Sequence, residues 1–454
     1  MTAAEKREKI AELKKKIEET QADYDRAKAM QLALKLVING TYGAFAHPKF
    51  VLSNSHIANA ITAMGRDVIQ YMLKKIEKYF YKEWHLDVAA HKRLGIEYIA
   101  EKDGKYFLLD RDGNNIHFPH ESLDEMFTKL NFSRLELKED KQELNGYNTL
   151  YRRDIHDFSN VKPLDKENEP IIIYGDTDSL YISFAPMIKS AGYKGDELDF
   201  ILHLDRVVVK KMFNRYLDEY AAKFGVTSLH DFELETINRS ALHIQKKHYI
   251  NNVAWEDGIF YDNLSYFYPK GVEIVKSSTP PFVRENIYEF LRYVFSNPNN
   301  LNIRKILLLV KDLKKQFMMA DIEDISMTSS CSNYSTKVID DVTDVVTVKG
   351  AHFAIKAAAL HNYLLNKNSE YKVKYDNIRG GRIKYYYCNH PKNNVFGYMR
   401  SMHPYEIVEK EGVKIDYDEQ FDVTMLSIIN RFLEPIGLPT INKRLSVLNS
   451  IFSI

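Results

Sequence analysis

The longest regular pattern in the chain is helical. Residues 4–38 contain neither proline nor glycine, and helix-forming residues dominate them. Side chains suited to a helix interface recur there at alternating spacings of three and four, as in a coiled-coil seam. The seam consists of Ile10, Leu13, Ile17, Thr20, Tyr24, Ala27, Gln31, Leu34 and Ile38. It needs a packing partner, which is either a helix of another chain or the body of this one.

Helical periodicity returns at 54–80, 195–224, 282–296 and 301–319. Residues 83–168 differ, because short strand-like runs alternate there with Asp-Gly turns. The runs lie at 96–99, 106–109 and 116–118, and the turns are Asp103-Gly104 and Asp112-Gly113. The second turn superficially suggests a calcium loop, but later ligands are absent, so a plain hairpin turn is favoured.

The clearest strand pattern surrounds a polar turn at 171–183, where two apolar runs predict a β-hairpin. Asp176 and Asp178 lie two residues apart at its tip, so on extended backbone they face the same side. Two carboxylates this close repel each other unless a cation lies between them, and their hard oxygens suit Mg²⁺. The alternative for a bare Asp-x-Asp is a surface hairpin with an acidic turn.

A second dense group of polar residues ends the first helix. Lys35, Asn39 and Tyr42 lie at i, i+4 and i+7, which places them on one helix face. A cation, an amide and an aromatic ring on one face suit a nucleotide's triphosphate, sugar and base. Gly43 removes a side chain there and permits close approach. The alternative is a solvated lysine followed by a helix C-cap at Gly43.

Composition changes this picture little. A chain of 454 residues predicts two or three domains, and 28% charged with 45% hydrophobic residues is ordinary for a globular protein. A net charge of +1 argues only weakly against nucleic acid, since local basic patches suffice. Cys331 and Cys388 lack metal-ligand spacing and suggest a reducing compartment. No apolar run reaches membrane-spanning length, which predicts a cytosolic protein without a membrane partner.

The two polar groups together resemble motifs of the family B DNA polymerases. Tyr-Gly-Asp-Thr-Asp-Ser at 174–179 resembles motif C, and the string at 35–43 resembles motif B, Lys-x-x-x-Asn-Ser-x-Tyr-Gly. The chain departs from motif B at Gly40, where the family usually has serine. Asn59-Ala60-Ile61-Thr62 is similar to the polymerases of T-even-type bacteriophages. The resemblance implies DNA-directed DNA polymerase chemistry in the cytoplasm of an infected bacterial host.

The resemblance also implies an α+β fold, with an antiparallel palm sheet, packed helices, a long fingers helix and a mostly helical thumb. The expected divisions follow the motifs and are 1–43 fingers helix, 44–82 palm helix region, 83–168 insertion of unknown role, 169–281 palm, 282–440 thumb and 441–454 clamp-binding peptide. Residues 232–237 are expected to form an alternating strand with both glutamates on one face.

Individual roles follow from the same resemblance. Asp176 and Asp178 would be catalytic and, with Glu235, would hold metal, while Lys35, Asn39, Tyr42 and Gly43 would bind the nucleotide. Lys246, Lys247 and Tyr249 resemble a Lys-Lys-x-Tyr element that grips primer–template phosphates. Adjacent lysines on a strand face opposite sides, so only one is expected to reach DNA.

The remaining DNA contacts implied by the resemblance are Tyr174, Gly175, Lys276, Ser277, Ser278, Lys349, His352 and Arg382. Basic residues interleaved with tyrosines at 382–387 suit sugar–phosphate contacts. Their alternative is an exposed hairpin with ordinary aromatic packing. The apolar C-terminus resembles a sliding-clamp peptide, with Leu448, Ile451 and Phe452 as the contacts.

One element of the family is missing from the sequence. Two-metal phosphoryl transfer needs further carboxylates, and motif A, which supplies an aspartate, is not found. We therefore predict the C-terminal subunit of a split polymerase that uses two Mg²⁺ ions, or Mn²⁺. An N-terminal chain would bring motif A, the first fingers helix and a 3′–5′ exonuclease, and dNTPs, primer–template DNA and a sliding clamp would bind.

Other interpretations remain open at this point. A fragment of an unsplit enzyme would give the same pattern, although Met1-Thr-Ala-Ala before a charged helix reads like a natural chain start. A non-catalytic module that holds primer–template DNA and a clamp is the alternative function. The aspartate pair and the Lys35 face argue against it, because a DNA holder needs neither. A polymerase remnant is the third interpretation.

Overall fold

The computed structural model describes residues 3–132, 136–176, 179–298, 300–400 and 402–442, with backbone alone for 3–8. The chain divides into two compact units, Met1–Glu233 and Leu234–Ile454. Each unit is described separately. All strand pairs within the described ranges are antiparallel, in agreement with an α+β fold.

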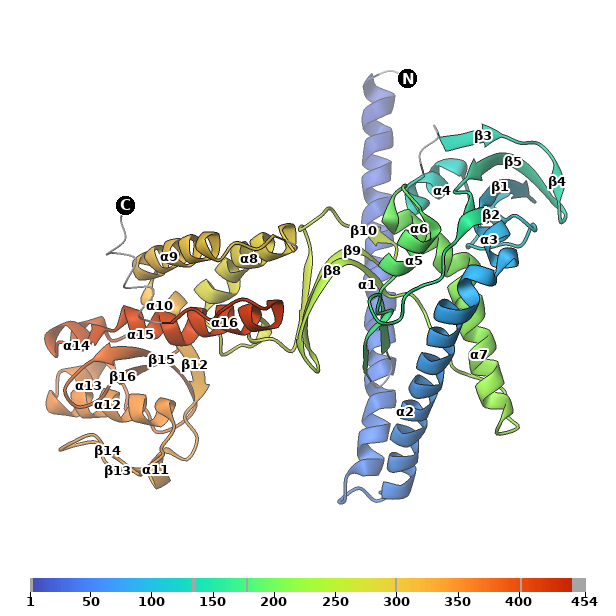
Figure 1. Cartoon of the computed structure of the whole chain (residues 1–454). Helices are drawn as coiled ribbons and strands as arrows, with labels where there is room; N and C mark the ends of the chain where they lie inside the picture. The colour runs from blue at the N-terminus through green and yellow to red at the C-terminus, as the bar shows by residue number, and fades with distance from the viewer. Residues whose placement is uncertain (1–2, 133–135, 177–178, 299, 401, 443–454) are drawn as a thin grey trace. The chain divides into compact units, whose positions relative to one another are not determined.

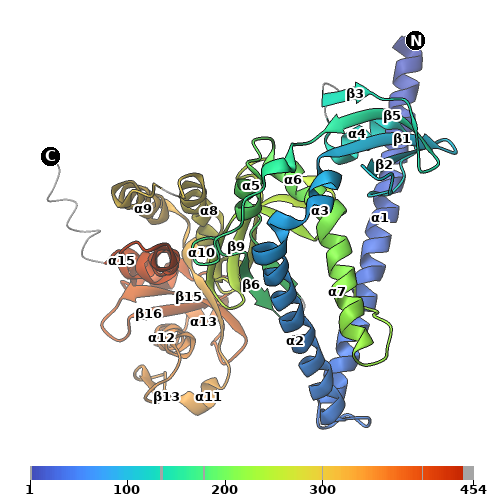
Figure 2. The ribbon, with the colours of Figure 1, turned by 45° about the vertical axis from the view of Figure 1, so that its right-hand side comes forward.

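Two long helices begin the first unit (Figure 1). Helix α1, Ala3–Ala46, confirms the predicted helix and continues past it, so Gly43 lies inside the helix rather than at a C-cap. Helix α2, Ser55–Lys78, confirms the second predicted helix. It begins at Asn54, whose side chain accepts hydrogen bonds from the backbone N–H groups of His56 and Ile57. The short connection turns α2 back along the C-terminal part of α1, as Figure 2 also shows.

The predicted insertion forms a five-stranded sheet. Strand order is β2-β1-β5-β3, with β4 beside β5. The strands are β1 Ile96–Lys102, β2 Lys105–Asp110, β3 Leu137–Glu139, β4 Glu143–Leu144 and β5 Tyr147–Asp154. Asp103-Gly104 closes the β1–β2 hairpin as predicted, with both residues at positive φ. The run at 116–118 is not a strand, since only isolated bridges at Asn115 and His120 flank it.

Short helices make up most of the rest of the first unit. They are η1 Tyr79–Glu83, η2 Trp84–Leu86, α3 Val88–Leu94, α4 Leu123–Leu130, η4 Phe158–Asn160 and α5 Ala185–Ala191. The predicted helix at 195–224 is confirmed as α6 Glu197–Leu204, η5 Asp205–Val209 and α7 Lys210–Ala222. Asp110 is buried, and its Oδ1 accepts hydrogen bonds from the N–H groups of Asp112 and Asn114, so the second Asp-Gly turn is a hairpin turn and not a calcium loop.

One hydrophobic core joins the insertion to the rest of the first unit. Met72 of α2 and Phe80 of the adjoining η1 share it with Leu108 of the sheet and Phe200 of α6. A buried ion network crosses the same boundary. Glu97 accepts a 2.6 Å hydrogen bond from Arg153 Nε, and the Arg153 guanidinium also donates to Asp199 of α6. The insertion is therefore an integral part of this unit.

Two sheets organise the second unit. The first has the order β10-β9-β11 with β8 beside β9, and the second has β12-β15-β16 with β17 beside β15. Their strands are β8 Thr236–Gln245, β9 His248–Glu256, β10 Ile259–Phe260, β11 Phe267–Lys270, β12 Met327–Ser330, β15 Arg382–Asn389, β16 Val395–Met399 and β17 Lys414–Ile415. A small β13–β14 pair, Val338–Asp340 with Val346–Thr347, adds to them. The second sheet was not anticipated within the mostly helical segment.

Helices α8 Pro281–Ser296 and α9 Ile303–Met319 confirm the two helical patterns of this region. The other helices are η6 Glu273–Val275, α10 Ile322–Ile325, α11 Tyr334–Lys337, α12 Phe353–Lys367, α13 Tyr371–Lys374, α14 Tyr405–Lys410, α15 Tyr417–Phe421, η7 Asp422–Leu426, α16 Ser427–Leu433 and η8 Glu434–Ile436. Phe290 and Phe317 pack with Phe421 and Phe432 in the main core. Cys331 and Cys388 are buried and form no disulfide. No described helix is both long enough and apolar enough to cross a membrane.

Candidate nucleotide and nucleic-acid site

The predicted aspartate hairpin is present in the first unit. Strands β6 Ile172–Asp176 and β7 Ser179–Ile182 pair with Asp176 opposite Ser179. The rings of Tyr174 and Tyr181 lie 5.7 Å apart on it, and a Cβ added at Gly175 would lie 4.0 Å from Ile69 on α2. Helix α2 thus supports the hairpin. Within the described ranges, β6 and β7 pair only with each other, so the expected larger palm sheet around them is not formed.

Asp176 ends β6 as a half-buried carboxylate. Asp178 lies outside the described residues, and the described ones contain no group of three His, Cys, Asp or Glu side chains able to hold a metal. Carboxylate oxygens are the donors that Mg²⁺ takes, so Asp176 fits a metal site as one ligand.

The placement of Glu235 corrects the predicted strand at 232–237. Strand β8 begins only at Thr236, and both Glu233 and Glu235 are exposed residues before it. Asp257 N–H donates to the Glu235 carbonyl, which ties this stretch to the turn after β9. Glu235 belongs to the second unit and Asp176 to the first. A metal site that combines them therefore stays a prediction.

The predicted nucleotide-binding face lies on the exposed part of α1. Lys35, Asn39 and Tyr42 are all exposed residues of one uninterrupted helix, so their spacing does place them on one face. Gly43 has open space around it, because an added Cβ would meet nothing within 4 Å. Gly40 is equally open. The serine usual in the family would therefore fit at this position without steric conflict.

The Lys-Lys-x-Tyr element differs from its predicted geometry. Lys246 and Lys247 form the tight turn between β8 and β9, where Gln245 pairs with His248, rather than lying on a strand. Both are exposed, and Lys247 has φ +65°. Because a turn does not force the two side chains onto opposite faces, the expectation that only one reaches DNA no longer follows. Tyr249 is 2% exposed on strand β9, where its ring lies 5.2 Å from that of His243, so its contact with DNA stays a prediction.

Gly271 holds the loop after β11 against this turn. Its φ is +68°, and an added Cβ would overlap the Lys247 carbonyl oxygen. The sequence pattern did not identify this residue, although a glycine directly after a short strand is a signal of close backbone approach. The same loop continues into Lys276, Ser277 and Ser278, all exposed.

Arg382 meets this loop from a position more than 100 residues further along the chain. Its Nη2 donates a 2.8 Å hydrogen bond to Ser277 Oγ. The structure thereby connects three separately predicted groups, which we call the basic loop surface. It consists of Lys246, Lys247, Lys276, Ser277, Ser278 and Arg382.

The other predicted contacts of this unit are less closely connected. Lys349 is exposed in the turn before α12, and His352 caps α12, its Nδ1 accepting from the Ala354 N–H at 3.2 Å. The tyrosines at 385–387 are buried, with Tyr386 fully so. The buried rings cannot contact a sugar–phosphate backbone directly. They pack against other side chains of the core instead, as the aromatic-packing alternative proposed. The predicted clamp contacts Leu448, Ile451 and Phe452 lie outside the described residues.

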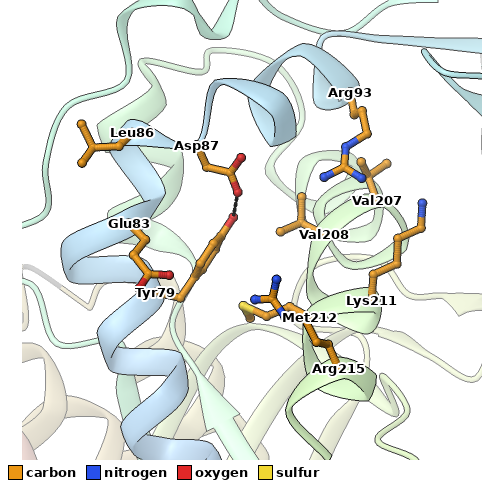
Figure 3. A pocket seen from close by; sticks show the side chains of 10 residues that line it. All are labelled: Tyr79, Glu83, Leu86, Asp87, Arg93, Val207, Val208, Lys211, Met212 and Arg215. Atoms are coloured by element: carbon orange, nitrogen blue, oxygen red, sulfur yellow. Dashed lines mark hydrogen bonds between the residues drawn. The ribbon is translucent and has the colours of Figure 1, made fainter. Parts of the chain in front are cut away.

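A cavity of about 490 Å³ lies elsewhere in the first unit (Figure 3). Arg93, Lys211 and Arg215 line one side of it, and Glu83 and Asp87 the other. These charges have partners within the unit, such as the 3.2 Å pair between Lys211 and Asp110 and the 2.6 Å pair between Lys78 and Glu83. None of the predicted nucleotide, metal or DNA residues lines this cavity.

An α+β chain with an Asp-tipped hairpin, a Lys-Asn-Tyr helix face and a basic loop surface has the parts of a nucleic-acid enzyme. The family model of DNA polymerase family B matches residues 4–436. The chain belongs to this family, and its membership supports DNA polymerase activity on dNTPs and primer–template DNA. No curated protein matches the chain.

Proposed function

We propose that the chain is the C-terminal subunit of a split DNA-directed DNA polymerase of T-even phage type, which works in the host cytoplasm. The observation that carries the polymerase assignment is the family match over 4–436, which includes both the Lys35 helix face and the Asp176 hairpin. Within this proposal the chain contributes one fingers helix, the palm and the thumb.

The residues take the following parts in the proposed reaction. The Lys35 ammonium binds the triphosphate, and Asn39 and Tyr42 contact the rest of the nucleotide. Asp176 and Asp178 provide carboxylates for metal, and Glu235 is the third metal ligand of the proposal. Two Mg²⁺ ions, or Mn²⁺, supply activation of the primer 3′-hydroxyl and stabilisation of the leaving pyrophosphate when bound.

The exposure of α1 supports the split-subunit part of the proposal. All residues from 9 to 43 are exposed, and large apolar side chains occur on more than one face of the helix. Leu34 and Ile38 of the seam are 56% and 69% exposed, and Leu32 and Leu36, outside the seam, are 58% and 62% exposed. Contiguous apolar surface of this kind marks an interaction site. A further chain that surrounds α1 and brings the motif A aspartate would cover it.

The basic loop surface supports primer–template binding. Lysine, arginine and serine hydroxyl groups are the usual phosphate contacts of DNA-binding proteins. The Arg382–Ser277 hydrogen bond fixes two of these groups relative to each other. We assign backbone binding of the primer–template to this surface and clamp docking to the segment 445–454.

Primer extension with Mg²⁺ tests the proposal. The chain alone should be nearly inactive, and its mixture with the polypeptide encoded directly upstream should extend primers. Asp176→Asn and Asp178→Asn should each reduce extension by the mixture at least about 100-fold, since each removes a metal-binding carboxylate. Asp112→Asn, at an exposed turn of the insertion, is the matched control and should keep the full rate.

Each outcome separates the interpretations. A full rate for Asp178→Asn would refute the catalytic assignment. Primer–template binding by the mixture without any extension would support the non-catalytic holder instead. Removal of 445–454 should lower processivity in the presence of the clamp and leave clamp-free extension unchanged. An equal loss in both assays would remove the clamp assignment while leaving the polymerase assignment in place.

A further inference from the structure

No residue that the structure describes covers the N-terminal part of the α1 seam. Ile10, Leu13 and Ile17 are 53%, 50% and 66% exposed. They follow the spacing of a coiled-coil stripe, and Figures 1 and 2 both show the N-terminal part of α1 running beyond the part that lies beside α2. Helices in proteins gain most of their stability by packing such a stripe against another element, and α1, with 44 residues, exposes its stripe.

Lysines line both edges of this stripe. Lys9 and Lys16 directly precede Ile10 and Ile17, and Lys14 directly follows Leu13. In a coiled coil, residues next to the apolar stripe in this way face the flanking residues of the partner helix. None of the three forms an ion pair within the described part of the chain.

Acidic residues of this segment lie away from the stripe. Glu12, Glu18 and Glu19 occupy the outer positions of the helix, and Glu19 pairs there with Lys15 at 3.8 Å. The charges of the segment are thus sorted, with cations at the edges of the interface. At the next turn Asp23 is the exception among the edge positions, and Arg26 pairs with it at 3.5 Å.

We propose that the N-terminal part of the seam binds an amphipathic helix whose apolar stripe is flanked by aspartate or glutamate. The proposal rests on the split-subunit assignment and specifies the chemistry of the partner's contacting helix. Opposite charges at the flanking positions determine which coiled-coil partner is selected. Three lysines beside an exposed stripe, which form no ion pair with the side chains that the structure describes, therefore select acidic flanks.

Two other occupants fit this charge pattern poorly. A second copy of the chain in parallel register would bring Lys9 opposite the partner's Lys14, and like charges at flanking positions are unfavourable. The C-terminal segment 443–454 is apolar enough to bind the stripe, but it contains no aspartate or glutamate and begins with Lys443 and Arg444. A copy in this parallel register and the C-terminal segment both lack acidic groups opposite the three lysines.

Two synthetic helical peptides of equal length test the proposal with the full chain. Both carry isoleucine and leucine along the stripe, and they differ only in having glutamate or lysine at every flanking position. Fluorescence anisotropy should show binding of the glutamate peptide at least about tenfold tighter than the lysine peptide, because three exposed charge pairs change sign. The preference should weaken at high salt.

Variants of the chain locate the effect. Lys9→Glu/Lys14→Glu/Lys16→Glu should reverse the preference, with circular dichroism confirming that helix content is kept. Lys14→Glu alone should reduce it, whereas Lys15→Glu, one position away on the outer face, should leave it unchanged. Equal binding of both peptides, binding of neither, or self-association of the chain through the seam in sedimentation would overturn the proposal.

The peptide assay contains neither DNA, metal nor nucleotide. Its failure therefore leaves the polymerase assignment standing. Conversely, loss of the polymerase assignment through a fully active Asp178→Asn mixture would not alter the measured peptide preference. The two proposals can thus fail separately.

Discussion

The close approach of Gly271 to the lysine turn gives a prediction with a matched control in the same sheet. Gly271 has φ +68°, and an added Cβ would overlap the Lys247 carbonyl oxygen. Gly258, in the turn between β9 and β10, has φ +86°, but a Cβ there would meet nothing within 4 Å. Alanine introduces a similar backbone strain at both positions, because both have positive φ. Only Gly271→Ala adds a steric conflict.

The expected magnitudes follow from these two terms. An L-residue held in the left-handed region costs about 1–2 kcal/mol, which is the whole effect expected for Gly258→Ala. At Gly271 the Lys247 carbonyl must also move by roughly 1 Å to reach ordinary contact, and overpacking of this kind adds about 1–3 kcal/mol. We therefore expect Gly271→Ala to lower the free energy of unfolding by about 2–5 kcal/mol.

Urea denaturation measures the two free energies, and hydrogen exchange localises the loss. Faster exchange should appear at the amides of β9 and β11 next to the turn in Gly271→Ala. Because the displaced carbonyl belongs to Lys247, this variant should also bind primer–template DNA more weakly than Gly258→Ala does. Equal destabilisation by the two substitutions would refute the close-approach argument.

Three further predictions concern other parts of the chain. Glu97→Gln should destabilise the first unit by about 1.5–3 kcal/mol in urea denaturation, because it removes the carboxylate 2.6 Å from buried Arg153 while the Arg153–Asp199 pair remains. Burial opposes ionisation of Glu97, but Arg153 and then His203 hold its pKa well below the usual range. The pKa of Glu97 is lower in the folded protein than its unfolded value of about 4.5. Ionised Glu97 therefore stabilises the fold above that pH, and the stabilisation is lost as the pH falls below it. Glu97→Gln should accordingly make the stability of the first unit depend less on pH in the acid range. Gly40→Ala should stabilise α1 by about 1 kcal/mol, measured by hydrogen exchange, because the helix has open space there. Lys246→Ala should reduce the slope of log K against log salt for DNA binding by about 1, and an unchanged slope would remove this lysine from the DNA surface.

The local patterns of the sequence determined the helices and the hairpin. Uninterrupted helix formers at 4–38 and the Asn54 cap specify α1 and α2 without reference to the rest of the chain. Strand-like runs around Gly175 and Asp176 specify the β6–β7 hairpin in the same way. Helical spacing alone also places Lys35, Asn39 and Tyr42 together, because a helix face depends only on neighbours within two turns.

Contacts between distant segments were decided only by the tertiary structure. The Lys246-Lys247 dipeptide carries no signal that separates a strand from a turn, and the pairing of β8 with β9 makes it a turn. The close approach of Gly271 to the Lys247 carbonyl also appears only in the tertiary structure. Arg382 reaches Ser277 across more than 100 residues. The tyrosines at 385–387 are buried because both faces of β15 are covered, with Tyr386 in one core cluster and Tyr385 and Tyr387 in another. Whether the seam of α1 is covered also depends on contacts with distant segments, so the sequence alone could not decide it. Its spacing predicts that a partner is required, but only the exposure of Ile10, Leu13 and Ile17 shows that the described part of this chain does not cover it.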